Sequence, residues 1–136
     1  MPLADQLPIV AFYVGLNGLI LVWLGLHVGK VRTKLGVRVG DGGKPALIRA
    51  MRGQANFAEY VPFALLILLA AAAVGTPGPL LHVFGVLLTL GRILHALHFT
   101  RDKAPSWMRG AGAGLTMLVL IAGSAGLIVQ ALWEGL

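Results

Sequence analysis

The sequence predicts an all-α integral membrane protein in which residues 1–136 form one bundle of four transmembrane helices. The composition is the first reason: 57% of the 136 residues are hydrophobic and 12% are charged, with a mean hydropathy of +0.84, whereas a soluble domain carries about 25% charged residues. The second reason is that four apolar segments each approach the roughly 20 residues that span a bilayer as a helix. These runs are continuous, which favours helices over the alternating strands of a barrel.

The first helix is expected over residues 7–30, where the apolar run from Leu7 to Val28 is the clearest of the four. Asn17 and His27 are polar positions within this run. A cleaved signal peptide is not expected. The residues before the run include Asp5 but no lysine or arginine, and the run is longer than the apolar region of a signal peptide.

The second helix is expected over residues 45–74. Pro45 suits the first turn of a helix, where its missing N–H leaves no hydrogen bond unmade. The helix has a polar first half, followed by an unbroken apolar run from Val61 to Val74. The polar half is expected to stand at the cytoplasmic mouth of the bundle.

The third helix is expected over residues 79–99 and the fourth over residues 108–134. The segment 75–79 contains the glycines and prolines of a tight turn, which separates the second helix from the third. Pro105 lies near the start of the fourth helix. The residues that follow Arg109 are small and suit close helix packing.

The basic residues predict the topology of the chain, which has a formal net charge of +6. All eleven lysines and arginines lie either between the first and second apolar segments or from the end of the third apolar segment to the start of the fourth. The chain ends carry Asp5 and Glu134 but no basic residue. The positive-inside rule therefore predicts two cytoplasmic basic loops and both termini outside. Nucleic acid is not an expected partner, because the basic residues flank membrane spans.

A polar stripe on the second helix is the most informative feature of the sequence. Its members fall within roughly a third of the helix circumference and are Arg49, Arg52, Asn56, Glu59 and Tyr60. Each ionised side chain at membrane depth costs on the order of 2.5–3.5 kcal/mol on insertion scales. A one-sided polar stripe that leads into a membrane span therefore indicates a buried polar ligand.

Three further residues extend this set at the cytoplasmic end of the bundle. Arg92 and His95 are three apart and share a face of the third helix, and Arg109 lies at the mouth of the fourth helix. Together the set offers guanidinium groups for carboxylates, an amide for a peptide bond and a carboxylate for an ammonium group. This chemistry suits a small zwitterionic peptide such as glutathione.

A structural interpretation of the same residues is also open. Arg49, Arg52, Arg101 and Arg109 could be interfacial anchors that meet anionic lipid headgroups. Arg92 could form a structural ion pair with Glu59. Neither interpretation accounts for Asn56.

The chain contains no cysteine, which excludes disulfides, thiolate metal sites and a cysteine nucleophile. Thiol chemistry would need a thiol from a ligand. The spacing of His95 and His98 would permit a shared metal, and His27, His82 and His95 lie on three predicted helices. However, His82 is expected near the outer face, and no paired-helix Glu-x-x-His pattern is present. A metal site is not expected.

The chain resembles the membrane-associated proteins in eicosanoid and glutathione metabolism, the MAPEG superfamily. The resemblance covers nearly the whole chain and rests on three groups of residues. The second helix carries Arg49-x-x-Arg52-x-Gln54-x-Asn56-x-x-Glu59-Tyr60-x-Pro62. Gly40-Asp-Gly-Gly43 before that helix, and Gly91-Arg92-Ile-Leu-His95-Ala96 on the third, are typical of the short bacterial branch.

The resemblance implies a homotrimer of four-helix subunits in a bacterial inner membrane, with glutathione as co-substrate in clefts between neighbouring subunits. Arg52, Asn56 and Glu59 match residues that contact glutathione in the family, and Gln54 and Tyr60 match positions used by the leukotriene-conjugating member. Arg92 and His95 match residues of the prostaglandin E synthase branch. Arg109 matches the arginine that activates the thiol, with Arg101 as a rival.

The implied function is that of a detoxifying glutathione transferase that acts on hydrophobic electrophiles in the membrane and needs no metal. Glutathione peroxidase activity is left open. Two departures argue against specialised eicosanoid synthesis: Phe99 stands where those synthases have tyrosine, and Gly110 stands where the prostaglandin E synthase has serine. The alternatives are a non-catalytic, lipid-binding trimer of the same fold and a small transporter.

Overall fold

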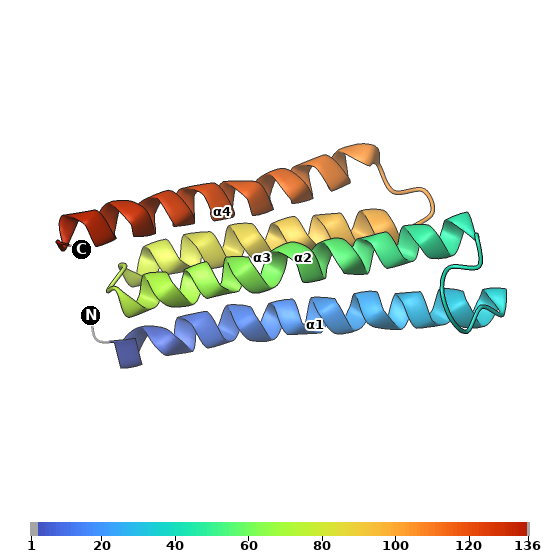
Figure 1. Cartoon of the computed structure of the whole chain (residues 1–136), viewed down its shortest axis with the longest axis horizontal. Coiled ribbons are helices and arrows are strands. Elements are labelled where there is room, and N and C mark those ends of the chain that lie inside the picture. The colour runs from blue at the N-terminus through green and yellow to red at the C-terminus, as the bar shows by residue number, and fades with distance from the viewer. Residues whose placement is uncertain (1–2, 136) are drawn as a thin grey trace.

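The computed structural model describes residues 3–135 and contains there four antiparallel helices (Figure 1). They are α1 (Leu3–Leu35), α2 (Pro45–Ala73), α3 (Gly78–Thr100) and α4 (Ser106–Trp133). The start of α1, the α2–α3 turn and the end of α4 lie at one end of the bundle, and the α1–α2 and α3–α4 loops lie at the other, the loop end. All four helices are long and apolar enough to cross a membrane, which confirms the predicted fold class.

α1 is the helix whose bounds differ most from the expected ones. It was expected over residues 7–30 but extends from Leu3 to Leu35, because hydropathy marks only the part of a helix that lipid would solvate. Its last turn carries Arg32 and Lys34, whose charges suit the C-terminal end of a helix dipole. Gly36, with a φ of 68°, then ends the helix in the left-handed conformation. The other three helices begin or end within two residues of the expected positions, a difference that helix ends commonly show.

The two middle helices of the bundle, α2 and α3, separate the outer pair. α1 and α4 each pack against both α2 and α3, but α1 and α4 do not contact each other within the described residues. Figure 1 shows this order, with α1 on one side of the central pair and α4 on the other. α4 therefore packs on the central pair from the side opposite α1.

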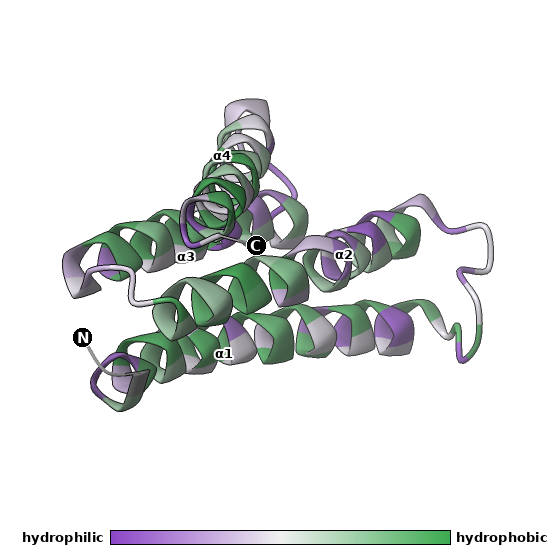
Figure 2. Cartoon of the chain, turned by 60° about the vertical axis from the view of Figure 1, so that its left-hand side comes forward, coloured by the Kyte–Doolittle hydropathy of each residue, from purple (hydrophilic) through white to green (hydrophobic). Residues whose placement is uncertain are grey.

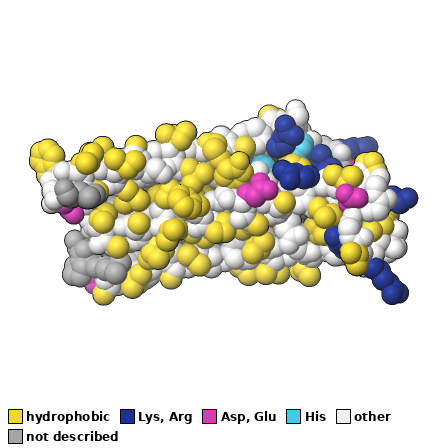
Figure 3. Space-filling model, in the orientation of Figure 1, with side chains coloured by type: hydrophobic (Ala, Val, Ile, Leu, Met, Phe, Trp, Pro, Cys, Tyr) yellow, Lys and Arg dark blue, Asp and Glu magenta, His cyan; other side chains and the backbone are white. Residues whose placement is uncertain are grey.

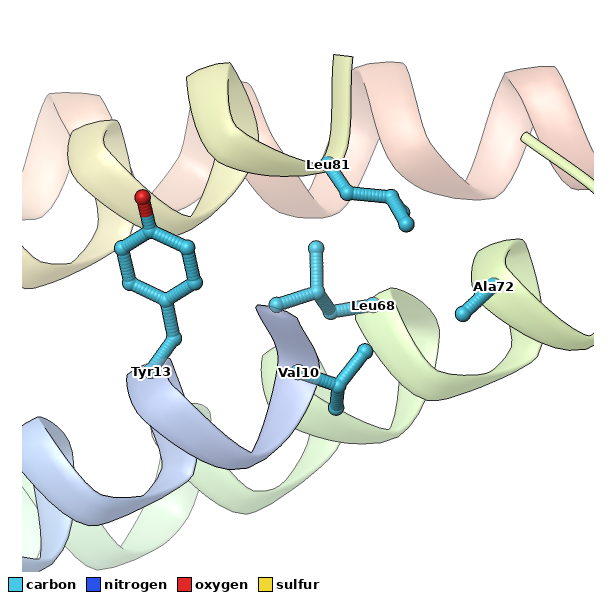
Figure 4. Close-up of a cluster of buried hydrophobic side chains, with 5 residues drawn as sticks. All are labelled: Val10, Tyr13, Leu68, Ala72 and Leu81. Atoms are coloured by element: carbon cyan, nitrogen blue, oxygen red, sulfur yellow. The ribbon is translucent and has the colours of Figure 1, made fainter. Parts of the chain in front are cut away.

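Small hydrophobic clusters hold the helices together along the bundle. Figure 4 shows the cluster of Val10, Tyr13, Leu68, Ala72 and Leu81, which joins α1, α2 and α3 at the end opposite the loops. These side chains are 0–4% exposed. Between segments that already lie in lipid, close packing contributes van der Waals contact rather than a hydrophobic driving force.

A buried amide links α1 to α3 near the middle of the bundle. The Asn17 side-chain N–H donates to Thr89 Oγ1 at 3.0 Å and to the backbone oxygen of Tyr13 at 2.9 Å. Interhelical hydrogen bonds of this kind contribute about 0.6 kcal/mol on average in a membrane protein. Asn17 is therefore a structural residue of the α1–α3 contact.

α3 and α4 approach each other most closely at two glycines. A Cβ on Gly112 would lie 2.5 Å from the backbone oxygen of Gly91 and 2.8 Å from the Cβ of His95. Since real Cβ atoms do not come that close, only glycine fits at position 112. The α3–α4 crossing is thus fixed beside His95.

The surface divides into an apolar belt and a basic end. Hydrophobic residues dominate the helices in Figure 2, and hydrophobic side chains cover most of the face seen in Figure 3. Lysine and arginine side chains gather at the loop end in Figure 3. Large apolar side chains remain exposed on all four helices, including Leu19, Phe63, Leu90 and Ile121. This is the surface that lipid would cover.

Candidate functional site

A polar cleft opens between α2, α3 and α4 in the half of the bundle nearer the loop end. It has a volume of about 320 Å³ and is lined by Arg52, Asn56, His95, Phe99, Arg109 and Ala113. A second hollow of about 190 Å³ adjoins it and is lined by Asn56, Tyr60, Arg92, Ala113, Thr116 and Met117. Asn56 and Ala113 line both hollows. The polar cleft thus collects predicted site residues from three helices.

Arg92 is the most deeply buried cation of the site. Its side chain is 1% exposed, and Nη1 donates to Asn56 Oδ1 at 3.0 Å. Its Nε and Nη2 atoms are buried and have no hydrogen-bond partner among the described residues. Because a buried guanidinium strongly favours an acceptor for every N–H, Arg92 has unused capacity to bind an anion.

The ion pair considered between Glu59 and Arg92 is wrong. Glu59 instead approaches Arg52, with 3.9 Å between Arg52 Nη1 and Glu59 Oε1. The reason is geometric: Arg52 and Glu59 lie two turns apart on one face of α2, while Arg92 is engaged by Asn56 one turn before Glu59.

The Arg52–Glu59 contact leaves both groups available to a ligand. Their side chains are 62% and 51% exposed, and the separation is at the limit for an ion pair. Exposed pairs of this kind contribute about 0–1 kcal/mol. A ligand with its own carboxylate and ammonium groups could therefore replace this contact at small cost.

His95 and Phe99 form the α3 wall of the polar cleft. Their ring centroids lie 4.8 Å apart, with the planes tilted by 34°. Phe99 packs directly on the α2 backbone, since a Cβ on Gly53 would lie 2.7 Å from the Phe99 Cβ. Both residues also meet a glycine of a neighbouring helix, since a Cβ on Gly112 of α4 would lie 2.8 Å from the His95 Cβ.

Arg109 and its rival Arg101 occupy different environments. Arg109 lies in the first turns of α4 and lines the polar cleft opposite Arg52 and Asn56. Arg101 follows the last turn of α3 as its C-cap, is exposed, and does not line the cleft. Of the two arginines, only Arg109 is positioned to act on a group bound in the cleft.

Comparison with known proteins agrees with the resemblance found in the sequence. The profile of the MAPEG family matches residues 10–129. The chain belongs to the MAPEG family. The inner membrane protein YecN of Escherichia coli strain K12 is 31% identical over 111 residues, which are 82% of this chain and 83% of YecN. YecN of Escherichia coli O6:H1 matches with the same identity and coverage. This MAPEG chain is thus an integral membrane protein with a bacterial inner-membrane relative.

Two predicted site residues of the MAPEG chain line neither hollow: Glu59, which approaches Arg52, and Gln54. Gln54 faces α1, where its amide nitrogen would stand 3.5 Å from a Cβ on Gly25. The cause is the helix period, since residues two apart on a helix point about 200° from each other, and Asn56 faces the cleft. Within one subunit, Gln54 therefore does not share a site with Asn56.

Arg49 has a role that the sequence did not predict. It was interpreted as a headgroup anchor, but its guanidinium donates to the backbone oxygen of His98 and lies 5.3 Å from the centroid of the Phe99 ring. Nothing in the sequence pairs position 49 with position 98, because this contact depends on how α2 and α3 align. The α4 residues that line the hollows, Ala113, Thr116 and Met117, were also missed, although they continue the face of Arg109 at helical spacing.

The histidines of the MAPEG chain serve separate contacts. His98 is bonded to the backbone oxygen of Pro105 at 3.2 Å, and His82 to the Tyr13 hydroxyl at 2.9 Å. Within residues 3–135 the structure contains no group of three histidine, aspartate or glutamate side chains that could hold a metal ion.

A separate apolar hollow lies toward the end opposite the loops. It also has a volume of about 320 Å³ and is bordered by Phe84, Val119, Gly123 and Leu127, with Thr76 and Gln130 among its few polar residues. No ionisable side chain lines it. The chemistry of the molecule therefore concentrates in the polar cleft.

Proposed function

We propose that this protein is a membrane-bound glutathione transferase that conjugates glutathione to hydrophobic electrophiles dissolved in the bilayer. The observation that carries the proposal is the convergence of Arg52, Asn56, Arg92 and Arg109 on two adjoining hollows in the half of the bundle nearer the basic loop end. The MAPEG family includes glutathione transferases, which adds support. Since the chain has no cysteine, the reacting thiol must come from the ligand.

The site residues divide the binding of glutathione according to charge. Arg52 and Arg92 bind the two carboxylates, for which guanidinium groups provide paired N–H donors. Asn56 bonds to the peptide backbone, and Glu59 binds the α-ammonium group. Tyr60 and His95 border the bound peptide.

Arg109 activates the thiol by stabilising its ionised form. A free thiol has a pKa of about 8.5, so only a few per cent is thiolate at pH 7. A guanidinium about 4 Å from the sulfur contributes roughly 4 kcal/mol at an effective dielectric of 20. Desolvation and the exposure of Arg109 remove part of this, which leaves a decrease in the thiol pKa of about one to two units.

The reaction is a nucleophilic addition or substitution in which all atoms are accounted for. The thiol proton leaves to water at the mouth of the polar cleft, and the thiolate electron pair forms a new carbon–sulfur bond. The electrophile either accepts a proton after addition or releases its leaving group with the bonding electrons. Because the membrane concentrates the apolar partner beside the cleft, proximity supplies much of the remaining rate. Peroxide reduction by two glutathione molecules is a second reaction that the same thiolate would support.

A homotrimer would complete the site with residues from a neighbouring subunit. Gln54 lies on the face of α2 opposite Asn56, so one subunit cannot use both residues on one ligand. In a closed ring, each subunit presents its Asn56 face to one neighbour and its other side to the next. Gln54 would then serve the cleft of the adjacent subunit.

The orientation in the membrane follows from the same charges. The polar cleft lies near the loop end, where lysine and arginine side chains gather (Figure 3). The positive-inside rule places this end in the cytoplasm and both termini outside. Glutathione would enter from the cytoplasm.

Titration of the purified full-length protein with glutathione tests the proposal. Calorimetry measures binding, and the ultraviolet absorbance of the thiolate measures ionisation of the bound thiol near neutral pH. A transferase forms thiolate under conditions where free glutathione remains a thiol, and it conjugates an apolar electrophile in proteoliposomes. If glutathione does not bind, the non-catalytic, lipid-binding role replaces the enzyme, and the apolar hollow becomes the more relevant site.

A further inference from the structure

Within the described residues, one side-chain hydrogen bond attaches the start of α4, at the loop end, to α3. The His98 Nδ1 atom lies 3.2 Å from the backbone oxygen of Pro105. A carbonyl oxygen only accepts, so Nδ1 carries the proton and donates it. Pro105 is the N-cap of α4, and its oxygen also accepts the first hydrogen bond of that helix, from the Met108 N–H at 3.2 Å. His98 therefore holds α3 to the point where α4 begins.

Arg49 fixes the same region from α2. Its guanidinium donates to the backbone oxygen of His98, one of the last four carbonyls of α3, which lack partners within a helix. A cation there is also favoured by the helix dipole. The guanidinium lies 5.3 Å from the centroid of the Phe99 ring, and this ring meets His98 edge-on at 5.1 Å. Arg49 thereby links α2 to both His98 and the wall of the polar cleft.

Arg109 lies between two points at which α4 is held against α3. One point is the hydrogen bond at Pro105. The other is the close crossing at Gly112, where an added Cβ would lie 2.5–2.8 Å from atoms of Gly91 and His95. The crossing sets how close the helices come. The bond at Pro105 sets where the first turns of α4 lie relative to the end of α3.

We propose that Arg49 and His98 are positioning residues that hold Arg109 over the polar cleft. This inference rests on the proposed transferase function and adds two residues to it. Neither side chain lines the cleft, so neither touches the ligand. Their effect on the reaction passes through the position of the Arg109 guanidinium, and since a Coulomb energy falls with distance, displacing this group raises the pKa of the bound thiol.

Two variants of His98 separate positioning from mere filling of space. His98→Phe keeps an aromatic ring but removes the N–H donor. His98→Asn provides a side-chain N–H the same number of bonds from the backbone as Nδ1 and restores the donor. His82→Phe is the matched control, because it removes a histidine hydrogen bond to Tyr13 at the other end of the bundle. If His98→Phe does not fold, Arg49→Met tests the same link from α2.

The first measurement needs no ligand. The chain has no cysteine, so Ala46→Cys and Ser106→Cys, both at exposed positions, provide two sites for spin labels at the loop ends of α2 and α4. Labelled chains are diluted with unlabelled chains to isolate distances within a subunit. The distance distribution is expected to be narrow in the parent, broad with His98→Phe, and narrow again with His98→Asn or His82→Phe.

The second measurement is the pH dependence of thiolate formation and turnover. The charged and titratable groups around the two hollows are Arg49, Arg52, Glu59 and Tyr60 on α2, Arg92, His95 and His98 on α3, and Arg109 on α4. With His98→Phe, the pKa of bound glutathione is expected to rise by about one unit. The thiolate fraction at pH 7 then falls about fivefold and turnover about twofold, because the more basic thiolate is the better nucleophile. Turnover recovers at high pH, where the thiol is ionised without help. The Kd for glutathione stays within about threefold.

The outcomes distinguish this inference from the proposed function. An unchanged distance distribution together with an unchanged pH profile in His98→Phe overturns the positioning role. A His98→Asn variant that behaves like His98→Phe overturns it as well. If the parent protein neither binds glutathione nor forms thiolate, the transferase proposal fails, and the distance measurement alone decides whether His98 and Arg49 hold the start of α4.

Discussion

Replacing Arg109 by alanine gives the sharpest test of the proposed chemistry. The Arg109 guanidinium lines the polar cleft opposite Arg52 and Asn56 but is exposed at its mouth. The full interaction with a thiolate about 4 Å away, roughly 4 kcal/mol at an effective dielectric of 20, is therefore reduced by water, and about 2 kcal/mol remains. That is about 1.5 pKa units. In Arg109→Ala, the bound thiol returns from a pKa near 7 to about 8.5.

The sign of the pH effect follows from this shift. At pH 7 the thiolate fraction falls from about one half to about 3%, a factor of roughly 15. The thiolate of higher pKa is intrinsically more nucleophilic, with a Brønsted slope of about 0.4–0.5, which returns a factor of about five. The net loss of turnover is therefore about threefold at pH 7. Above about pH 9 the thiol is mostly ionised in both proteins, so the turnover of the variant should equal or exceed that of the parent.

The assay is conjugation of an apolar electrophile in proteoliposomes, measured as kcat against pH and paired with thiolate absorbance on glutathione addition. Arg101→Ala is the control, since it removes the same side chain from an exposed C-cap outside the polar cleft. It should leave the pH profile unchanged. Parallel profiles for the parent and Arg109→Ala would refute the assigned role, and a shifted profile in Arg101→Ala would transfer that role to Arg101.

Three further predictions test binding, packing and burial of charge. Glu59→Ala should raise the glutathione Kd about tenfold, which corresponds to the loss of one charged hydrogen bond. It should not raise the pKa of the bound thiol, because it removes a negative charge from the site. A calorimetric Kd equal to that of the parent would show that Glu59 serves only Arg52. Gly112→Ala should destabilise the detergent-solubilised protein by about 1–3 kcal/mol, because its Cβ would lie 2.5 Å from the Gly91 backbone oxygen. Gly114→Ala is the control, since a Cβ at position 114 meets no atom within 4 Å. Equal unfolding midpoints for the two variants would contradict the close α3–α4 crossing. Arg92→Met should leave the unfolding temperature unchanged or raise it, since the substitution removes a buried charge that no carboxylate balances. It should weaken glutathione binding at least tenfold. A large loss of stability would instead make Arg92 a structural residue.

Residues that share one helix were the predictable part of the site. The spacing of Arg52, Asn56 and Tyr60 places them on one face of α2, and all three line the two adjoining hollows. The period of a helix is fixed by its backbone, so such groupings need no tertiary information. The same period also turns Gln54 away from Asn56; the family resemblance grouped these two residues although one subunit does not bring them together.

Contacts between helices were the part that the sequence could not supply. An ion pair between Glu59 and Arg92 was considered because their charges are opposite. In the structure Arg92 donates to Asn56, and Glu59 approaches Arg52. Arg49 was left between the polar stripe and a lipid-headgroup anchor, yet its guanidinium donates to the backbone oxygen of His98 near the end of α3. Such pairings depend on the relative height and rotation of α2 and α3, which glycines such as Gly53 set through backbone contact.

The charge balance of the polar cleft favours one protonation state of its proposed ligand. Arg52, Arg92 and Arg109 bring three positive charges to the two hollows. Glu59 lines neither hollow but brings one negative charge next to Arg52. The surplus of two positive charges lies beside a membrane interior, where an unbalanced charge is costly. Neutral-thiol glutathione, with two carboxylates and one ammonium group, cancels only half of this surplus. Its thiolate form cancels all of it. Ionisation of the thiol is therefore favoured by the whole site as well as by the nearest guanidinium, and each arginine that is removed should raise the pKa of the bound thiol, most of all the one closest to the sulfur.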